Sequence, residues 1–161
     1  MKRMPTTIFS ESALIADQLH RAFYGNAWHG PAVVELLADV RADTAAAKPI
    51  ADVHSIWELL LHIAVWDNAG LVRLSGKKYQ PTGTDNFPLV TKPTEAAWRK
   101  AIAQAKRTHD RLTKTVASLP EARLRDRVPG KRYNFSHLLH GIVQHELYHA
   151  GQIAILKKAA Q

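Results

Sequence analysis

Residues 134–159 read NFSHLLHGIVQHELYHAGQIAILKKA and predict one long helix. His145 and His149 lie four residues apart in it, so their side chains point about 40° apart around the helix axis. Apolar side chains fall on or beside the same stripe, at Leu138, Ile142, Ile153 and Leu156. Because a helix of a globular protein turns its apolar stripe inward, we expect both imidazoles to face the core.

Two neighbouring buried imidazoles need partners for their ring nitrogens, since an unpaired buried polar group is costly. A divalent metal ion satisfies them well, because neutral imidazole is a good ligand. Hydrogen bonds to neighbouring helices would satisfy them too. The pair at His145 and His149 alone therefore leaves both interpretations open.

Further segments with helical periodicity, at residues 10–24, 53–74 and 94–119, predict three more long helices, and residues 31–40 predict a short one. The predicted N-caps are Ser10, Asp52 or Ser55, and Thr94. Residues 76–93 carry three prolines and two glycines and predict one extended loop. No alternating strand pattern is evident. We therefore expect an all-α protein, a four-helix bundle forming a single domain over residues 1–161.

The string His145-Glu146-Leu147-Tyr148-His149 matches H-E-x-x-H, the zinc metalloprotease pattern in which the Glu is general base. A protease is nevertheless disfavoured. No His, Asp or Glu follows His149 to serve as a downstream ligand, and the extended metzincin pattern is absent.

A third ligand must then come from upstream, and His62 is the best candidate. It lies in Leu60-Leu61-His62-Ile63-Ala64, in the middle of the most apolar predicted helix. Three histidines with an open coordination position are typical of a catalytic rather than a structural metal site. A divalent metal is expected: the donor types suit zinc, nickel, cobalt, manganese or iron, and zinc or nickel is favoured.

Other residues are assigned to the surroundings of this site. Trp28, His29 and Gln152 are predicted to line a substrate pocket. Glu58, one turn before His62, is predicted to orient its imidazole. His109 lies among basic residues and is expected to be solvated. Close helix approach is the reason considered for Gly141 and Gly151.

The composition excludes several classes of protein. The chain has no cysteine, which excludes disulfides, thiolate metal sites and a cysteine nucleophile, and which fits a cytoplasmic protein. The N-terminal MKRMPTTIF lacks the apolar segment of a signal peptide, and no apolar stretch is long enough to span a membrane. Residues 76–161 carry 16 basic against 6 acidic side chains. No nucleic-acid-binding motif accompanies this charge, so a nucleic-acid partner is disfavoured.

The chain resembles the DinB-like (DinB/YfiT) family in three places. These are Trp28-His29-Gly30-Pro31, then HSIWELLLHIAVWD around His62, then LLHGIVQHELYHAGQIAILKK around His145 and His149. The resemblance implies a four-helix bundle with long crossover connections and a metal held by those three histidines. It also implies a homodimer, and an activity such as that of thiol-dependent transferases and isomerases.

Two functional hypotheses follow. The first is a metal-dependent enzyme, a thiol-dependent transferase or a hydrolase, acting on a small-molecule substrate. Any thiol must then be a low-molecular-weight cosubstrate, since the chain has none. The second is a non-catalytic metal- or ligand-binding bundle, such as a stress-response protein.

Overall fold

The computed structural model describes residues 10–160, which form eight helices and no β-strand. The N-terminal segment MKRMPTTIF, in which the sequence predicts no signal peptide, lies outside the described residues. The helices are α1 (Glu11–Tyr24), α2 (Val33–Leu37), α3 (Ala42–Ala46), α4 (Ile56–Leu74), α5 (Gly83–Asn86), α6 (Glu95–Ala117), α7 (Glu121–Leu124) and α8 (Phe135–Ala159). The all-α prediction and its four long helices are confirmed.

Each long helix begins at a side chain that accepts a hydrogen bond from the first turn. Ser10, Ser55 and Thr94 accept from the main-chain N–H three residues on, and Asn134 does the same for α8. Such a cap contributes about 1 kcal/mol, because it satisfies a donor that the helix leaves unpaired. The boundaries are therefore set locally, within two or three residues of those predicted.

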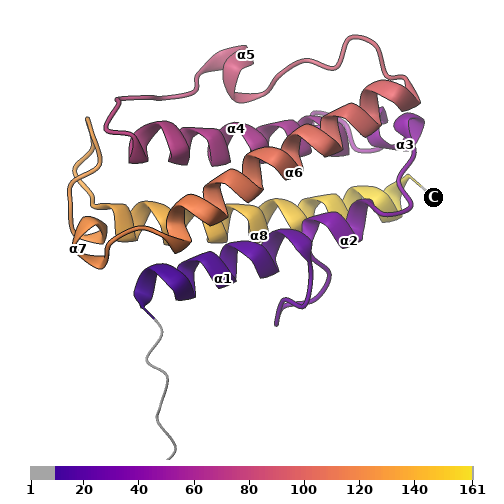
Figure 1. The fold of residues 1–161 in the computed structure, drawn as a ribbon. Helices are drawn as coiled ribbons and strands as arrows, with labels where there is room; N and C mark the ends of the chain where they lie inside the picture. The colour runs from indigo at the N-terminus through magenta and orange to yellow at the C-terminus, as the bar shows by residue number, and fades with distance from the viewer. Residues whose placement is uncertain (1–9, 161) are drawn as a thin grey trace, which may run out of the picture.

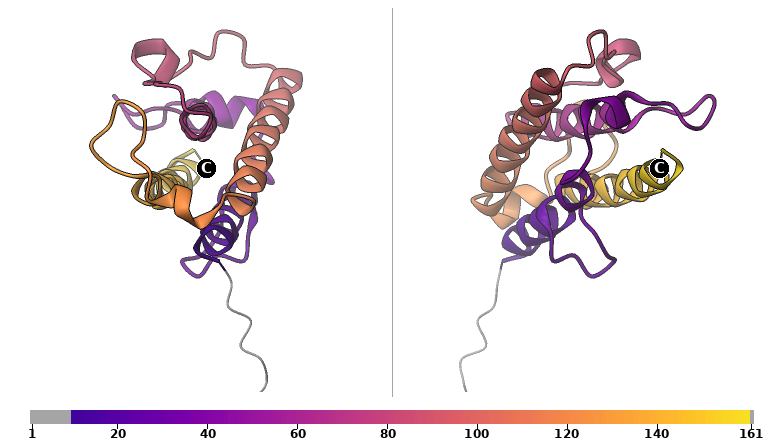
Figure 2. Two further views of the ribbon diagram at one scale, coloured as in Figure 1. Left: turned by 60° about the vertical axis from the view of Figure 1, so that its left-hand side comes forward. Right: turned by 90° about the vertical axis from the view of Figure 1, so that its right-hand side faces the viewer.

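The four long helices α1, α4, α6 and α8 make the bundle, and α1 and α4 each pack against both α6 and α8 (Figures 1 and 2). Helices α4 and α6 run in the same direction, so the chain between them returns along the whole bundle. Residues 75–94 make that return and pass over α4, with α5 inside it (Figure 1). The connection is a long crossover rather than a tight turn.

A glycine sets the close approach of α4 to α8. A Cβ at Gly70 would lie 2.8 Å from Cδ1 of Ile142, nearer than side-chain atoms normally come. At Gly141 and Gly151 no atom lies within 4 Å of a built Cβ, so close helix approach is not the reason for either. Among residues 10–160, no helix combines the length and apolar character that crossing a membrane requires.

Candidate metal centre

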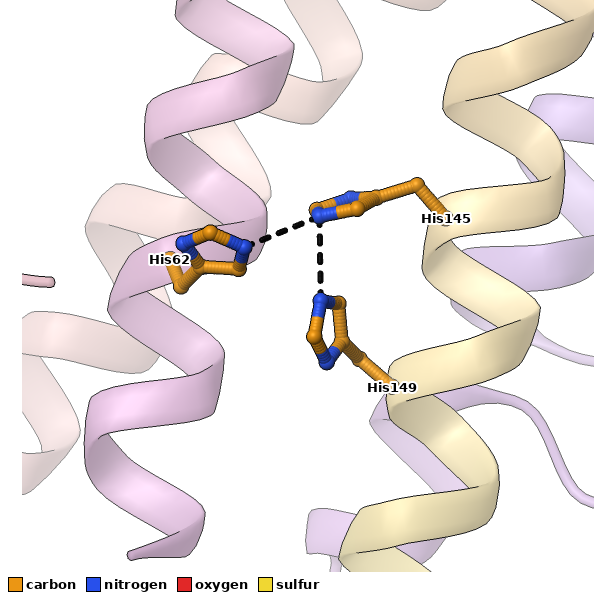
Figure 3. A group of neighbouring side chains, drawn as sticks. All are labelled: His62, His145 and His149. Atoms are coloured by element: carbon orange, nitrogen blue, oxygen red, sulfur yellow. Dashed lines mark hydrogen bonds between the residues drawn. The ribbon is translucent and has the colours of Figure 1, made fainter. Parts of the chain in front are cut away.

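Three histidine rings converge between α4 and α8 (Figure 3). Nε2 of His145 lies 3.0 Å from Nε2 of His62 and 3.0 Å from Nε2 of His149. The three form a group whose ligand atoms lie close enough together to hold one metal ion. Nitrogens that share a zinc ion at 2.0–2.1 Å stand roughly 3.3 Å apart in tetrahedral geometry. The spacing in the structure is therefore near that of a shared ion.

The opposite nitrogens of two rings are held by oxygen acceptors. Nδ1 of His62 donates to the main-chain oxygen of Asn86 at 2.8 Å, and Nδ1 of His149 donates to Oε1 of Gln152 at 2.6 Å. A neutral imidazole carries one N–H, so Nε2 of both rings presents a lone pair. The pattern is that of metal-ligating histidines, whose second nitrogen is bonded to an oxygen that fixes the tautomer.

The hydrogen count also fits a cation at the centre. With Nε2 of His62 and His149 unprotonated, only the ring of His145 can place a hydrogen among the three atoms. One N–H cannot serve two 3.0 Å contacts equally well. Nδ1 of His145 is buried without a hydrogen-bond partner among the described residues. The donor set, three neutral imidazoles with converging lone pairs, suits a divalent metal ion.

Burial keeps these rings uncharged at neutral pH. It lowers the pKa of His62 to about 4, against the hydrogen bond to Asn86 that raises it. Burial, with the neighbouring rings of His149 and His62, lowers the pKa of His145 to about 3. The pKa of His149 is lowered too, mainly by burial. All three are therefore in the metal-binding form at pH 7.

Residues 75–94, the return segment, supply one wall of the site. The Phe87 ring stacks on the ring of His62, with centroids 3.9 Å apart. The Phe87 ring also stacks on the ring of His54, with centroids 3.8 Å apart. Nε1 of Trp66 donates to Oδ1 of Asn86 at 3.0 Å. Sequence reasoning did not find Asn86 or Phe87. The signal available was the length of the predicted loop 76–93, since long loops are often functional.

A second polar cluster lies in the core, formed by Asp67, His109 and Glu146. Nδ1 of His109 lies 3.1 Å from a carboxylate oxygen of each acid, and none of the three side chains exceeds 1% exposure. The expectation that His109 is solvated is therefore wrong. The reason is its register: it lies on the inner face of α6 with Ala105, Leu112 and Val116, whereas the basic residues occupy the other face.

Burial and neighbouring charges shift the pKa values of His109 and Glu146 in this cluster. The carboxylates of Asp67 and Glu146 raise the pKa of His109 to about 10, against its burial. Burial, together with the charge of Asp67, raises the pKa of Glu146 to about 8. At neutral pH the His109 ring is thus an imidazolium, and the raised pKa of Glu146 favours its protonated form. Glu146 faces α6 and not the three histidines, which removes the geometric basis of an H-E-x-x-H protease.

The remaining predicted residues lie at different distances from the centre. Gln152 supports His149, as described. Glu58 accepts a hydrogen bond from the main-chain N–H of Ser55 and pairs with Lys48, so it is part of the N-terminal cap of α4. The His62 ring is bonded instead to the main-chain oxygen of Asn86. Trp28 and His29 line a hollow against α1 and α8 and not the cavity beside His145. Gly25, Asn26 and Gly30 of that loop have positive φ angles, and Trp28 is fully exposed.

A cavity of about 220 Å³ adjoins His145. His145 and Trp66 form one side of it, with their rings 5.7 Å apart. Its lining is mostly apolar, from Leu138 and Ile142 of α8. A small molecule in this cavity would therefore lie directly against one of the three rings.

The family model of the DinB superfamily matches residues 27–153 of the chain. This span includes all three histidines and most of the bundle. The chain belongs to the DinB superfamily, and the helical bundle described above is the fold of that superfamily. A search of curated proteins and a search of solved structures each found no match.

Proposed function

We propose that the chain is a metal-dependent enzyme in which His62, His145 and His149 hold one divalent ion through their Nε2 atoms. The observation that carries this is the convergence of three Nε2 atoms while two of the opposite nitrogens are bonded to oxygen. Hydrogen bonding alone supplies too few hydrogens to join the three Nε2 atoms. A divalent ion would be a common partner for the three nitrogens and, when bound, lowers the pKa of a coordinated water or thiol.

The residues of the chain support chemistry on a small substrate. The three rings are neutral, so a bound ion keeps its positive charge undiminished by carboxylate ligands. The cavity beside His145 would let a substrate lie against that ring, and the Trp66 ring offers it an apolar surface. Glu146 is directed elsewhere, so proton transfer would rely on water or on the substrate.

Transfer of a small thiol to an electrophile, or hydrolysis assisted by the ion, is the reaction class proposed. The chain has no cysteine, so the thiol would be a separate cosubstrate. The second candidate is a bundle that binds metal without catalysis. It is favoured by one observation, the absence of any aspartate or glutamate among the residues that line the cavity.

Elemental analysis of the purified protein tests the metal site. We expect one divalent ion per chain in the wild type, and its loss in His149→Ala. The matched control is His140→Ala, since His140 is an exposed histidine of the same helix. No stoichiometric metal in the wild type, or equal metal in both variants, would overturn the proposal. Consumption of a small thiol in the presence of an electrophile then separates an enzyme from a binding protein.

A further inference from the structure

A groove of about 350 Å³ adjoins the cavity beside His145, and Tyr133 and His137 line both. The groove is formed by the segment between α7 and α8. Its other lining residues are Arg125, Arg127, Arg132 and Asn134. The two hollows are therefore neighbours that share these two side chains.

The three arginines of the groove are exposed cations without carboxylate partners. No ion pair joins Arg125, Arg127 or Arg132 to an acid within residues 10–160. Asp126, the one acidic residue between α7 and α8, pairs instead with Arg123 at 2.9 Å. Three guanidinium groups around one groove favour an anion, because each offers a fork of donors that fits carboxylate and phosphate oxygens.

A fourth arginine lies in the wall of the inner cavity. Arg73 is fully buried, and its guanidinium stacks over Trp66 with 5.4 Å to the ring centroid. Its Nε and Nη2 donate to neutral oxygens of Tyr79 and Gln80, while Nη1 has no hydrogen-bond partner among the described residues. A buried cation without a counter-charge is costly, so an anion nearby would stabilise it.

The lining of both hollows matches one kind of ligand. Neither contains an aspartate or a glutamate. The inner cavity, at about 220 Å³, exceeds the roughly 150 Å³ that accommodates a benzene ring in an apolar core. Gly141 lines it with no atom within 4 Å of a built Cβ, so the missing side chain leaves part of this space open.

We infer that the groove and the cavity together bind a small organic anion, with its apolar body against Trp66 and its carboxylate or phosphate on the arginines. This inference deepens the proposed function, since the body of the ligand would then lie against the His145 ring. The charged group would be a carboxylate or a phosphate, both of which the arginines recognise.

Titrations of the full chain after removal of metal with a chelator test the inference apart from the metal. The probes are phenylacetate, benzyl phosphate and the neutral phenylacetamide, followed through the indole N–H resonance of Trp66 by NMR. We expect at least one anion to shift that resonance and to bind at least tenfold more tightly than the amide. Comparison of the two anions identifies the preferred charged group.

Two matched pairs of variants locate the binding. The triple variant R125Q/R127Q/R132Q should lose affinity tenfold or more. Its control R99Q/K100Q/R107Q removes the same charge from exposed positions of α6 and should stay within twofold of wild type. Gly141→Val should abolish the Trp66 shift by filling the cavity, whereas Gly151→Val, at an exposed position of the same helix, should not.

Equal loss in both triple variants, equal binding of the amide, or an unchanged Trp66 shift in Gly141→Val would overturn the inference. So would a DNA oligonucleotide that binds through the three arginines while none of the small anions shifts Trp66. The metal proposal fails separately, if the protein holds no ion but the metal-free chain still binds the anions. The reverse result, metal without anion binding, removes only the inference.

Discussion

Nδ1 of His62 on α4 donates a hydrogen bond to the main-chain oxygen of Asn86, 24 residues further along the chain. This bond joins a ring of the metal centre to the segment that crosses over the bundle. It holds the ring in the tautomer that turns the Nε2 lone pair toward His145. The return segment is thus part of the centre, although none of its residues is a ligand.

Phe87→Ala should weaken metal binding by about 10-fold, because its ring holds that of His62 on one face and the return segment in place. Competition with a chromophoric chelator measures the affinity. Leu89→Ala is the control, since Leu89 belongs to the same segment but is exposed. An equal affinity of the two variants would show that the segment does not position the ligand.

Replacement of Gln152 separates hydrogen bonding from packing at His149. Gln152→Leu removes the acceptor of the Nδ1 proton and should weaken metal binding by roughly 10- to 100-fold. Gln152→Glu keeps an oxygen acceptor and should retain wild-type affinity or exceed it. The same chelator competition reads both. If Gln152→Glu binds as poorly as Gln152→Leu, the acceptor role is disproved.

The metal-free protein should lose stability on acidification. The pKa values of His62 and His145 lie at about 4 and about 3 in the folded chain, against 6.5 in an unfolded one. Between pH 6.5 and about 4 the unfolded chain therefore binds more protons, and each ring lowers the free energy of unfolding by up to about 1.4 kcal/mol per pH unit. Glu146 has a raised pKa, so it increases the free energy of unfolding over the same pH range, but it is one group against two.

Urea denaturation of chelator-treated protein at pH 6.5 and pH 5 measures this loss. The double variant H62Q/H145Q should show a much smaller difference between the two pH values, whereas His140→Gln should behave as wild type because His140 is exposed. A wild-type stability that rises on acidification would contradict the assignment of neutral rings.

The core cluster predicts a loss of stability on the alkaline side. His109 has its pKa raised to about 10, so its stabilising charge is fully present below pH 6.5 and is lost as the pH rises through about 10. The metal-free protein should therefore be most stable near pH 6.5. His109→Gln should flatten the alkaline limb of the curve, as followed by thermal unfolding.

His109→Gln should also destabilise the protein by about 3–5 kcal/mol, because it leaves two buried carboxyl groups without their cation. Thr113→Ala is the matched control. It removes only the hydroxyl that bonds Nε2 of His109 and should cost about 1 kcal/mol. Metal stoichiometry should be one in both variants, since the cluster faces away from the histidine centre. Loss of metal with His109→Gln would show that the two clusters are not independent.

The elements predicted well from the sequence are those fixed by local chemistry. Ser10 and Thr94 cap their helices as expected, and of the two candidates Asp52 and Ser55 it is Ser55 that caps α4. A cap involves only the next three residues, so it can be predicted locally. The short helices α3, α5 and α7 were not predicted, since segments of four or five residues owe their helicity to tertiary packing.

The residues of the site likewise divide into those that a local sequence pattern predicts and those that depend on the path of the chain. His145 and His149 share a face by helical geometry alone, and His62 follows from its place on an apolar helix. Asn86 reaches His62 only through the path of the return segment, which no local pattern encodes. The position of His109 was predictable, because the spacing from Ala105 to Leu112 and Val116 marks an inner face. The surrounding charges on α6 obscured it.

Because α4 and α6 run in the same direction, the chain must return along the outside of the bundle between them. The return segment is also the part of the chain that contacts His62. Phe87 and Val90 of that segment pack against the core and are only partly buried. We expect the segment to open locally while the four long helices stay assembled. Exchange of the ion with solution is then decoupled from the survival of the fold.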